Sequence, residues 1–534
     1  MADDELVAAV ALARQHSVGD LLRRTARRYP EKTAVVASGR RVSYAELDES
    51  VNRCARALTE SGLGKGDRLG LLSHNCWQFA VLTFAAARLG LVLVPVNFML
   101  TAPEVAYILE HAEVAGLVAE DTLVPTAEEA LQIAGRGAAV RGVIGFPGTD
   151  TAALDGWVDV DTWIDGSEAA PYPGVVVEDD DPIRLMYTSG TESRPKGVLL
   201  TSRSLISQYV SCAIDGGMGS KDIELHTLPL YHCAQLDCFF GVDVYLGATS
   251  IILPGPDPAA MLETIEREGV TKLFCPPTVW ISLLGHPDFG KRDLSSLVKG
   301  YYGASAMPVE VLREIRRRLP HLRLWNFYGQ TEMAPLATIL RPEEQDSRAG
   351  SAGRAALNVE TRVVDEEGND VAPGEIGEIV HRSPHATTGY YRRADQPAEA
   401  FRGGWFHSGD LGTLSEDGYL SVVDRKKDMI KTGGENVASR EVEEVLYELD
   451  GADEVAVFGV AHPRWIEAVA AVIVRAPGAT LSEEQVHDHA RRRLAGYKQP
   501  KFVTFVDALP KNPSGKILKR ELRATYAALA TADG

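Results

Sequence analysis

Residues 187–197, Tyr-Thr-Ser-Gly-Thr-Glu-Ser-Arg-Pro-Lys-Gly, are of the types that suit a phosphate-binding loop. Hydroxyl residues, glycines, Arg194 and Lys196 lie between two apolar runs, 183–186 and 198–200. Small residues let backbone N–H groups approach a polyanion, and hydroxyl and ammonium groups add donors and positive charge. This composition predicts nucleotide phosphate binding, and an ordinary polar turn is the alternative interpretation.

This stretch differs from the common phosphate loop, which ends Gly-Lys-Ser/Thr and opens a helix. Here Gly197 and Val198 follow Lys196, so no hydroxyl stands next to the lysine to hold Mg²⁺. Glu192 adds a carboxylate, which is unfavourable beside a polyphosphate unless it points away. We therefore leave Glu192 out of the predicted binding residues.

Length and charge limit the classes of protein to consider. A chain of 534 residues is too long for one compact core and predicts about two to four domains. Its 55 basic and 74 acidic side chains give a net charge of −19, which argues against nucleic-acid binding. An anionic substrate must therefore be met by local positive charge.

The cysteines and the apolar stretches predict a cytoplasmic protein without a transmembrane segment. None of the six cysteines forms a Cys-x-x-Cys pair, so neither a disulfide framework nor a thiolate zinc site is expected. The acidic residues 1–5 do not resemble a secretory signal. The most apolar stretch, 79–100, contains Arg88, Pro95 and Asn97, which fits a buried helix and strand better than a membrane span.

Further motifs follow the glycine-rich stretch along the chain. They are Leu228-Pro-Leu-Tyr-His232, Asn326-Phe-Tyr-Gly-Gln-Thr-Glu332, Trp405-Phe-His-Ser-Gly-Asp410, Asp424-Arg-Lys-Lys-Asp428, Gly433-Gly-Glu-Asn436 and Pro510-Lys-Asn-Pro-Ser-Gly-Lys516. In this order and spacing they resemble the motifs of the adenylate-forming enzymes over nearly the whole chain. That superfamily includes acyl-CoA synthetases, beetle luciferases and peptide-synthetase adenylation domains, and the chain is most similar to fatty or medium- and long-chain acyl-CoA synthetases.

This resemblance implies an ATP-dependent acyl-CoA synthetase. Such an enzyme activates an apolar carboxylic acid as acyl-AMP with pyrophosphate release, then transfers it to coenzyme A with release of AMP. ATP, Mg²⁺ and coenzyme A are the expected cofactors and co-substrates. A carboxylate is a poor electrophile, and catalysis of its attack on a phosphate depends mostly on positioning and electrostatics.

The resemblance also implies roles for individual residues. Lys516 would bridge the acid carboxylate and the α-phosphate, Glu332 would hold Mg²⁺, and Thr188 would assist catalysis from the phosphate loop. Tyr328 would stack on adenine, and Asp410 would accept from both ribose hydroxyls. The nucleotide-binding residues would be Thr188, Ser189, Gly190, Thr191, Lys196, Gly303, Ala304, Ser305, Tyr328, Gly329, Thr331, Asp410, Arg425 and Lys516.

Acyl and thiol binding are assigned to a further set of residues. His232 would be a gate between the acyl pocket and the thiol channel, and no proton transfer is assigned to it. Gln235 stands where many fatty-acid relatives have glycine, which changes the pocket. Lys427 matches the hinge about which the C-terminal domain would rotate. The thiol channel would include His232, Gln235, Gly303, Gly433, Gly434 and Glu435.

Alternating helical and strand patterns must position these residues. Strands are predicted at 33–37 and 68–72, helices at 44–61 and 77–89, and a Gly-Arg-Arg turn at 39–41. Such alternation predicts an α/β fold with parallel-type sheets covered by helices. The expected domains are an N-terminal domain at 1–424 with a β-rich subdomain at about 347–423, a hinge at 425–428, and a mobile α+β domain at 429–534.

Other functions remain to be compared with this interpretation. A carboxylic-acid adenylating enzyme could pass the acyl group to the phosphopantetheine thiol of a separate carrier protein. Peptide-synthetase adenylation domains use an aspartate where this chain has Cys233, and a buried ammonium without a partner would be costly. Luciferase-type oxygenation stays open. A non-catalytic nucleotide-binding homologue would be expected to lose Glu332, Asp410 or Lys516, and this chain has all three. As for assembly, the resemblance implies a possible homodimer.

Overall fold

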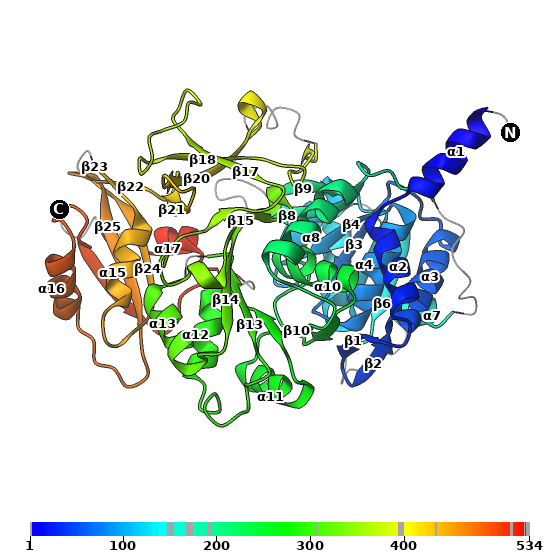
Figure 1. Cartoon of the computed structure of the whole chain (residues 1–534), viewed down its shortest axis with the longest axis horizontal. Helices are drawn as coiled ribbons and strands as arrows, with labels where there is room; N and C mark the ends of the chain where they lie inside the picture. The colour runs from blue at the N-terminus through cyan, green and yellow to red at the C-terminus, as the bar shows by residue number, and fades with distance from the viewer. Residues whose placement is uncertain are drawn as a thin grey trace.

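Two large sheets, a small sheet and a C-terminal lobe make up the computed structural model of the chain (Figure 1). It describes residues 3–135, 137–146, 154–166, 175–188, 195–305, 307–392, 400–432, 435–512, 516–527 and 529. In Figure 1 the C-terminal lobe, orange to red, lies at the opposite end from the blue N-terminal helices. The α/β prediction is therefore confirmed.

Each sheet is described by its strands in spatial order. The nine-stranded sheet runs β16 (Arg354–Ala355), β15 (Leu336–Leu340), β14 (Arg323–Gly329), β13 (Lys299–Gly303), β12 (Lys272–Phe274), β10 (Ile223–His226), β11 (Thr249–Ile252), β1 (Thr33–Ala37) and β2 (Arg40–Ser43). The eight-stranded sheet runs β19 (Gly389–Tyr390), β9 (Lys196–Thr201), β8 (Pro182–Thr188), β4 (Val92–Val96), β3 (Arg68–Leu72), β5 (Gly116–Glu120), β6 (Val140–Ile144) and β7 (Val158–Asp159). The centre of each sheet is parallel and its edges include antiparallel pairs.

Two smaller sheets follow in the sequence. The four-stranded sheet contains β17 (Glu360–Val364), β18 (Gly377–Arg382), β20 (Phe406–Leu414) and β21 (Leu420–Arg425). The C-terminal sheet contains β23 (Glu435–Val437), β22 (Ile430–Thr432), β25 (Ile466–Arg475) and β24 (Ala452–His462), with β26 (Phe502–Val506) paired to β25.

Helices cover the sheets, and the buried apolar side chains form separate clusters, the largest of which contains residues of both large sheets. The longer helices are α1 (Asp3–Arg14), α2 (Val18–Arg28), α3 (Tyr44–Glu60), α4 (Trp77–Leu89), α5 (Ala102–His111), α6 (Val124–Ala134), α8 (Ser202–Asp215), α11 (Pro258–Glu268), α12 (Pro277–Gly285), α13 (Val309–Arg318), α15 (Ser439–Tyr447) and α16 (Glu483–Arg493). Helix α4 is buried along nearly its whole length. Within the described ranges, no helix combines the length and apolar character needed to span a bilayer.

Most predicted local elements agree with the structure, and one turn was wrong. Residues 39–41 were predicted as a turn, but β2 begins at Arg40 and pairs antiparallel with β1. The turn is Ser38-Gly39, where both residues have positive φ, 50° and 77°. Two residues with positive φ form the hairpin turn that matches the twist of the flanking strands.

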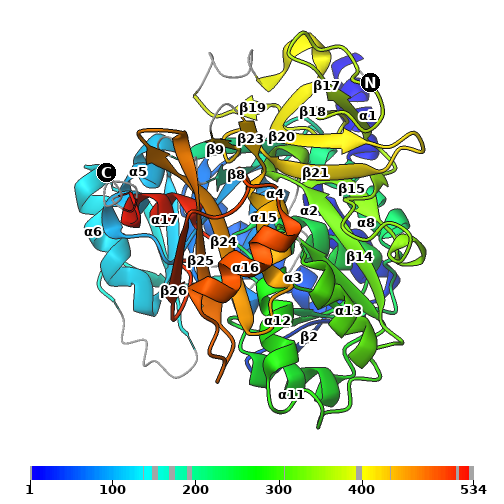
Figure 2. The same cartoon turned by 90° about the vertical axis from the view of Figure 1, so that its left-hand side faces the viewer.

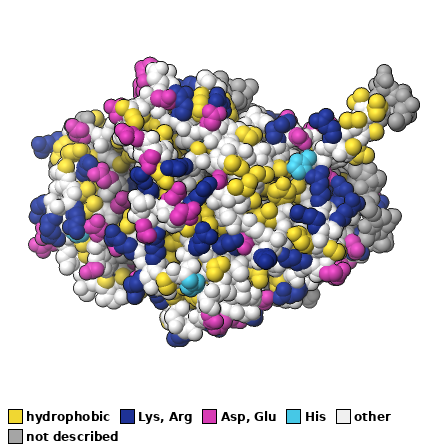
Figure 3. Space-filling model, in the orientation of Figure 1, with side chains coloured by type: hydrophobic (Ala, Val, Ile, Leu, Met, Phe, Trp, Pro, Cys, Tyr) yellow, Lys and Arg dark blue, Asp and Glu magenta, His cyan; other side chains and the backbone are white. Residues whose placement is uncertain are grey.

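The C-terminal lobe faces the viewer in Figure 2. Hydrogen bonds join it to the rest of the chain close to the predicted hinge. Ser439 donates from both its backbone N–H and its hydroxyl to Asp424 Oδ2, each at 2.7 Å. Arg440 donates to the carbonyls of Val422 and Gly350 at 2.6 and 3.3 Å. On the face shown in Figure 3, basic and acidic side chains are intermixed on this lobe.

Candidate active site

The predicted phosphate loop joins two antiparallel strands. β8 ends at Thr188, which pairs with Lys196 at the start of β9. Ser189, Gly190 and Thr191 lie outside the described residues. Lys196 Nζ lies 5.4 Å from the centre of the Tyr390 ring. The loop therefore closes a hairpin, and the helix that follows, α8, begins only after the second strand.

Glu332 lies beside the same tyrosine. The Tyr390 hydroxyl donates to Glu332 Oε1 at 2.9 Å, and the Glu332 backbone carbonyl accepts from Thr387 N–H at 2.7 Å. A carboxylate held by the tyrosine that Lys196 also faces suits Mg²⁺, which binds through one or two carboxylates together with substrate phosphates. The residues present fit this metal. Tyr390 was not among the predicted site residues, because it lies outside every motif identified in the sequence.

Tyr328, Asp410 and Arg425 form a connected group. The Tyr328 hydroxyl donates to Asp410 Oδ2 at 2.7 Å, and Arg425 Nε lies 3.0 Å from Asp410 Oδ1. Asp410 is buried, and its neighbour strand β21 carries Arg425 in register with it. Burial, and then the Asp410 carboxylate, raise the pKa of Tyr328 well above its ordinary value. Because carboxylate oxygens accept more than one hydrogen bond, Asp410 can still accept from a ribose diol.

Lys516 belongs to the C-terminal lobe, where flanking residues hold its backbone. Its backbone N–H donates to Asn512 Oδ1 at 2.8 Å, and Lys511 and Ile517 form a β-bridge. The side chain contacts solvent, yet the Arg425 guanidinium and then burial lower its pKa to about 8. Asp410 acts in the opposite direction and favours the charged form. The lysine is therefore close enough to both groups to interact with them electrostatically.

His232 belongs to the same neighbourhood. Burial and then the positive charge of Lys516 lower the pKa of this histidine to about 4, so the ring is neutral at pH 7. Its Nδ1 accepts from Ala234 N–H at 3.2 Å and caps the short helix α9 (Cys233–Gln235). The adjacent Cys233 Sγ lies 3.2 Å from Thr331 Oγ1. The structure thus brings together residues of five separate motifs, those that contain His232, Thr331, Asp410, Arg425 and Lys516.

Two glycines allow close backbone approach in this region. A Cβ on Gly303 would lie 2.2 Å from the Phe327 carbonyl oxygen, and one on Gly329 would lie 1.9 Å from the Pro335 carbonyl oxygen. Both distances are shorter than any tolerated contact, so glycine is required. Gly303 ends β13, and the next two residues, Ala304 and Ser305, are exposed where that strand ends.

Gln235, predicted to line the substrate and thiol channel, lies beside a group of buried titratable residues. It is fully buried, and its Nε2 lies 2.6 Å from His226 Nδ1. His226 Nε2 lies 3.2 Å from Asp243 Oδ2, and Lys272 Nζ is 2.7 Å from Glu224 Oε2. Glu224, His226 and Asp243 are near enough to hold a metal. However, the Lys272 ammonium also pairs with Asp243, so the cluster already contains its cation.

The remaining predicted residues lie in the C-terminal lobe and its connector. Glu435 is exposed on β23, the edge strand of the C-terminal sheet. Gly433 and Gly434 fall outside the described residues. Lys427 follows Arg425 in a turn where Asp428 N–H donates to the Arg425 carbonyl at 2.9 Å. Asp428 also pairs with Arg523 at 2.9 Å.

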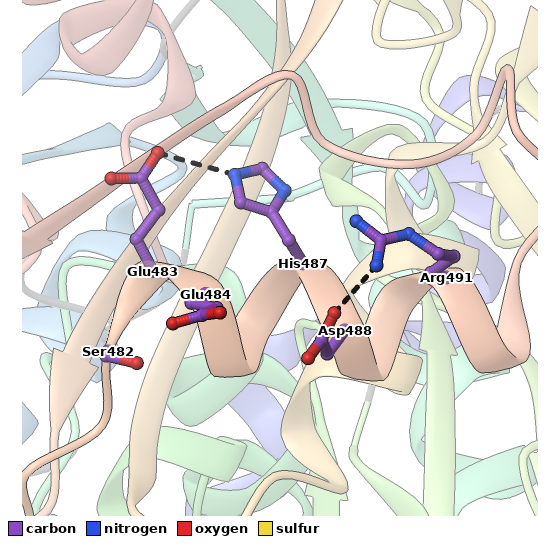
Figure 4. Close-up of a pocket in the computed structure, with 6 residues that line it drawn as sticks. All are labelled: Ser482, Glu483, Glu484, His487, Asp488 and Arg491. Atoms are coloured by element: carbon purple, nitrogen blue, oxygen red, sulfur yellow. Dashed lines mark hydrogen bonds and ion pairs between the residues drawn. The ribbon is translucent and has the colours of Figure 1, made fainter.

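A hollow on helix α16 is lined by none of the predicted site residues (Figure 4). It is lined by Ser482, Glu483, Glu484, His487, Asp488 and Arg491. Two pairs along the helix account for its charges: His487 with Glu483 at 3.3 Å and Arg491 with Asp488 at 2.7 Å. These are the i,i+4 and i,i+3 pairs of a solvated helix face.

Comparison with known protein families identifies the family to which this chain belongs. The model of the family "AMP-binding enzyme" matches residues 22–391, and that of the "AMP-binding enzyme C-terminal domain" matches residues 441–516. The chain belongs to the AMP-binding enzyme family. This confirms the resemblance to adenylate-forming enzymes.

Curated relatives in this family are acyl-CoA ligases. The chain is 37% identical to feruloyl-CoA synthase of an Amycolatopsis species, over 96% of this chain and 100% of that protein. It is 35% identical to a long-chain fatty-acid–CoA ligase of Mycobacterium tuberculosis, over 96% of this chain and 99% of that protein. These relatives support ATP-dependent acyl-CoA synthesis through an acyl-adenylate.

Solved structures of enzymes that use ATP or form an acyl-adenylate are similar to this chain over almost its whole length. ATP-bound MatB from Rhodopseudomonas palustris superposes with a TM-score of 0.86 at 31% identity, covering 96% of this chain and 99% of that one. An anthranilate CoA ligase with bound anthranoyl-AMP superposes with a TM-score of 0.89 at 26% identity, covering 97% and 98%. The fold is therefore that of enzymes crystallised with ATP and with an acyl-adenylate.

Proposed function

We propose that this AMP-forming acyl-CoA ligase activates an apolar carboxylic acid at the site formed by Lys516, Glu332, Tyr328 and Asp410. The supporting observation is the electrostatic proximity of Lys516 to Asp410, Arg425 and His232, residues that come from distant parts of the chain. A lysine from the C-terminal lobe adds to the positive charge that Arg425 and Lys196 supply for an anionic acid and ATP on a chain of net charge −19.

In the first step, a carboxylate oxygen of the acid attacks the α-phosphorus and pyrophosphate leaves. The Lys516 ammonium neutralises negative charge on the carboxylate and on the α-phosphate oxygens. Asp410 and Tyr328 orient the nucleoside, while Lys196 and Thr188 bind the outgoing phosphates. Mg²⁺, when bound at Glu332, would neutralise charge on those phosphates.

In the second step, the coenzyme A thiol attacks the acyl carbonyl and AMP leaves. The charge of Lys516 acts on Arg425, Asp410 and His232 in the orientation described, so we propose that rotation about Lys427 precedes thiol entry. Glu435, with Gly433 and Gly434, would then help to form the thiol channel. His232 stays neutral and acts as the gate beside the acyl group.

Several finer assignments are part of the same proposal. The acid could be fatty or aromatic, as in the named relatives, which act on feruloyl and long-chain fatty acyl groups. A related fatty acid–acyl-carrier-protein ligase, 34% identical, keeps a carrier-protein thiol as the alternative acceptor. Homodimer assembly and a cytoplasmic location are also proposed; the six buried free cysteines support a reducing compartment.

A pyrophosphate-release screen across carboxylic acids, with and without coenzyme A, tests the proposal. We expect acid-dependent pyrophosphate release without coenzyme A in a single turnover, and a CoA thioester when coenzyme A is added. A Lys516→Ala variant should lose the first step. Normal adenylation by that variant would contradict the role of Lys516, and transfer only to a carrier protein would favour the alternative acceptor.

A further inference from the structure

Helix α5 contacts the ends of both strands that carry the predicted phosphate-binding residues (Figure 2). Two of its side chains, Tyr107 and His111, are four residues apart and therefore lie on the same face of the helix. Their rings stack with their centres 5.4 Å apart. This face meets the end of β8 and the start of β9, so the helix can fix the two strand ends relative to each other.

The Tyr107 contact holds the beginning of β9. Its hydroxyl donates to the backbone carbonyl of Pro195 at 3.1 Å. Proline has no N–H, so this carbonyl is the only hydrogen-bonding group that residue 195 offers. Lys196, whose ammonium is assigned to the phosphates, is the next residue. A bond one residue away therefore limits where the Lys196 backbone lies.

His111 makes the corresponding contact with β8. Its Nδ1 lies 2.7 Å from the hydroxyl oxygen of Tyr187, and the two rings meet edge to face with centres 5.8 Å apart. Burial raises the pKa of Tyr187 above its ordinary value, so the hydroxyl keeps its proton. Thr188, the other phosphate-binding residue that the structure describes, follows Tyr187 directly. His111 thus acts on the Thr188 side of the hairpin as Tyr107 acts on the Lys196 side.

The anchored residues are at the end of a β-ladder. Tyr187 pairs with Gly197, and Thr188 pairs with Lys196, the last pair of this hairpin within the described residues. The ends of elements open more readily than their centres, because fewer neighbouring bonds hold them. Bonds from α5 to both strands restrict this opening at the place where the phosphate-binding residues stand.

Apolar packing alone does not account for these side chains. Tyr107 and Tyr187 are half-buried and pack against an apolar cluster that contains Leu185. A phenylalanine at each position would fill much the same space. The hydroxyl and the imidazole nitrogen add directional bonds, which define a position as well as filling a volume.

We propose that Tyr107 and His111 are positioning residues that hold Thr188 and Lys196 in place for the ATP phosphates. The inference rests on the proposed function, because it concerns the phosphate-binding part of the same site. Neither side chain contacts substrate in this proposal, and each acts through the residue next to its partner. A misplacement of about 1 Å can cost on the order of a hundredfold in rate, so small shifts of these strand ends matter.

The test removes one polar contact at a time and keeps each ring. Tyr107→Phe deletes the hydroxyl that donates to Pro195, and His111→Phe deletes the ring nitrogens. In both variants we expect the KM for ATP in pyrophosphate release to rise about fivefold or more, while the KM for the carboxylic acid stays within about twofold. The dissociation constant of ATP, measured calorimetrically without acid, should rise by a similar factor.

Two further variants separate positioning from general stability. The amide of His111→Asn places a polar atom near the position of Nδ1, so its KM for ATP should return to within about twofold of that of the unsubstituted chain. Tyr44→Phe is the matched control, because the Tyr44 hydroxyl also donates to a backbone carbonyl, that of Ala248 at 2.6 Å. Neither of those residues belongs to the predicted site. This control should lower the melting temperature without changing the KM for ATP.

A double-variant cycle determines whether Tyr107 acts through Lys196. In a Lys196→Ala background the phosphate-binding ammonium is already absent. Adding Tyr107→Phe to that background should therefore change kcat/KM for ATP by about twofold or less. Full additivity of the two changes would mean that Tyr107 acts elsewhere, and would overturn its assigned role.

The other outcomes are equally decisive. Unchanged ATP affinity in both Tyr107→Phe and His111→Phe would overturn the inference, as would an equal rise in the KM for the carboxylic acid. No recovery in His111→Asn would overturn the part assigned to His111. Absence of pyrophosphate release with every acid would instead contradict the proposed function. The calorimetric measurement does not depend on turnover, so in that case it still tests the positioning of the phosphate-binding residues.

Discussion

The hydroxyl of Tyr390 donates a 2.9 Å hydrogen bond to Glu332 Oε1, while Lys196 Nζ lies 5.4 Å from the centre of the same ring. One tyrosine from the short strand β19 thus contacts both the carboxylate assigned to the metal and the lysine assigned to the phosphates. Tyr390 pairs with Val198 of β9, so the sheet fixes its position. Tyr390 is accordingly a positioning residue.

Replacing Tyr390 with phenylalanine should raise the Mg²⁺ requirement. The change removes the bond to a charged group, worth about 1.5–3 kcal/mol, while the ring beside Lys196 remains. We expect the Mg²⁺ concentration for half-maximal pyrophosphate release to rise roughly tenfold. Mn²⁺ binding measured calorimetrically should weaken in parallel. Tyr391→Phe is the control, and an equal effect there would contradict the assignment.

The alkaline limb of the pH profile should depend on Lys516. Its pKa is lowered to about 8, so the charged form that can bridge two anions is present below this pH and is lost above it. We therefore expect kcat/KM for adenylation to fall as the pH rises through about 8. A Lys516→Arg variant stays charged. It should be slower but should show no alkaline decline, and persistence of that decline would assign it to another group.

The free energy of unfolding should depend more on Lys272 than on Glu224, which both belong to the buried cluster around Asp243. Lys272→Met removes the ammonium that pairs with the buried Asp243 carboxylate, which should cost about 3–5 kcal/mol of unfolding free energy. Burial raises the pKa of Glu224 well above its usual value, which favours the neutral form of its side chain. Glu224→Gln imitates that neutral form and should cost about 1 kcal/mol or less. Urea unfolding measures both, and equal losses would contradict this charge distribution.

The hinge assignment predicts a separation of the two half-reactions. Proline at position 427 restricts the backbone rotation that domain movement requires. In Lys427→Pro we expect single-turnover acyl-AMP formation to stay within about threefold, while thioester formation falls at least tenfold. Lys426→Ala is the control, since it alters a neighbouring charge without restricting the backbone. Unchanged thioester formation in Lys427→Pro would rule out rotation at this residue.

Local patterns in the sequence predicted much of the fold. The strand Thr33–Ala37 and the helix Trp77–Leu89 were predicted at the residues where they occur, because apolar periodicity and flanking turns define them locally. The turn at 39–41 was misplaced because Ser38, rather than an arginine, takes the positive φ. Sequence alone favoured the glycine and two polar residues over the serine before them.

The polar interior was harder to predict from sequence. Lys272, Asp243 and Glu224 come from three elements, and only the folded chain brings them together. Each charged residue interrupts an apolar segment, as Arg184 does in 183–186, and that interruption was the available signal. Tyr390 could not be recognised because its partner, Glu332, is distant in sequence. Pairing across the fold, rather than local pattern, determines these contacts.

The hairpin formed by β8 and β9, which contains the predicted phosphate loop, has a consequence for nucleotide affinity. In loops that open a helix, aligned peptide dipoles at the helix N-terminus attract the phosphates. Here the strand that begins at Lys196 follows the loop, so that source of attraction is absent from this end of the described hairpin. Attraction must come mainly from side-chain cations on a chain of net charge −19. Because mobile ions screen such charges, ATP should dissociate more readily as the ionic strength of the medium increases.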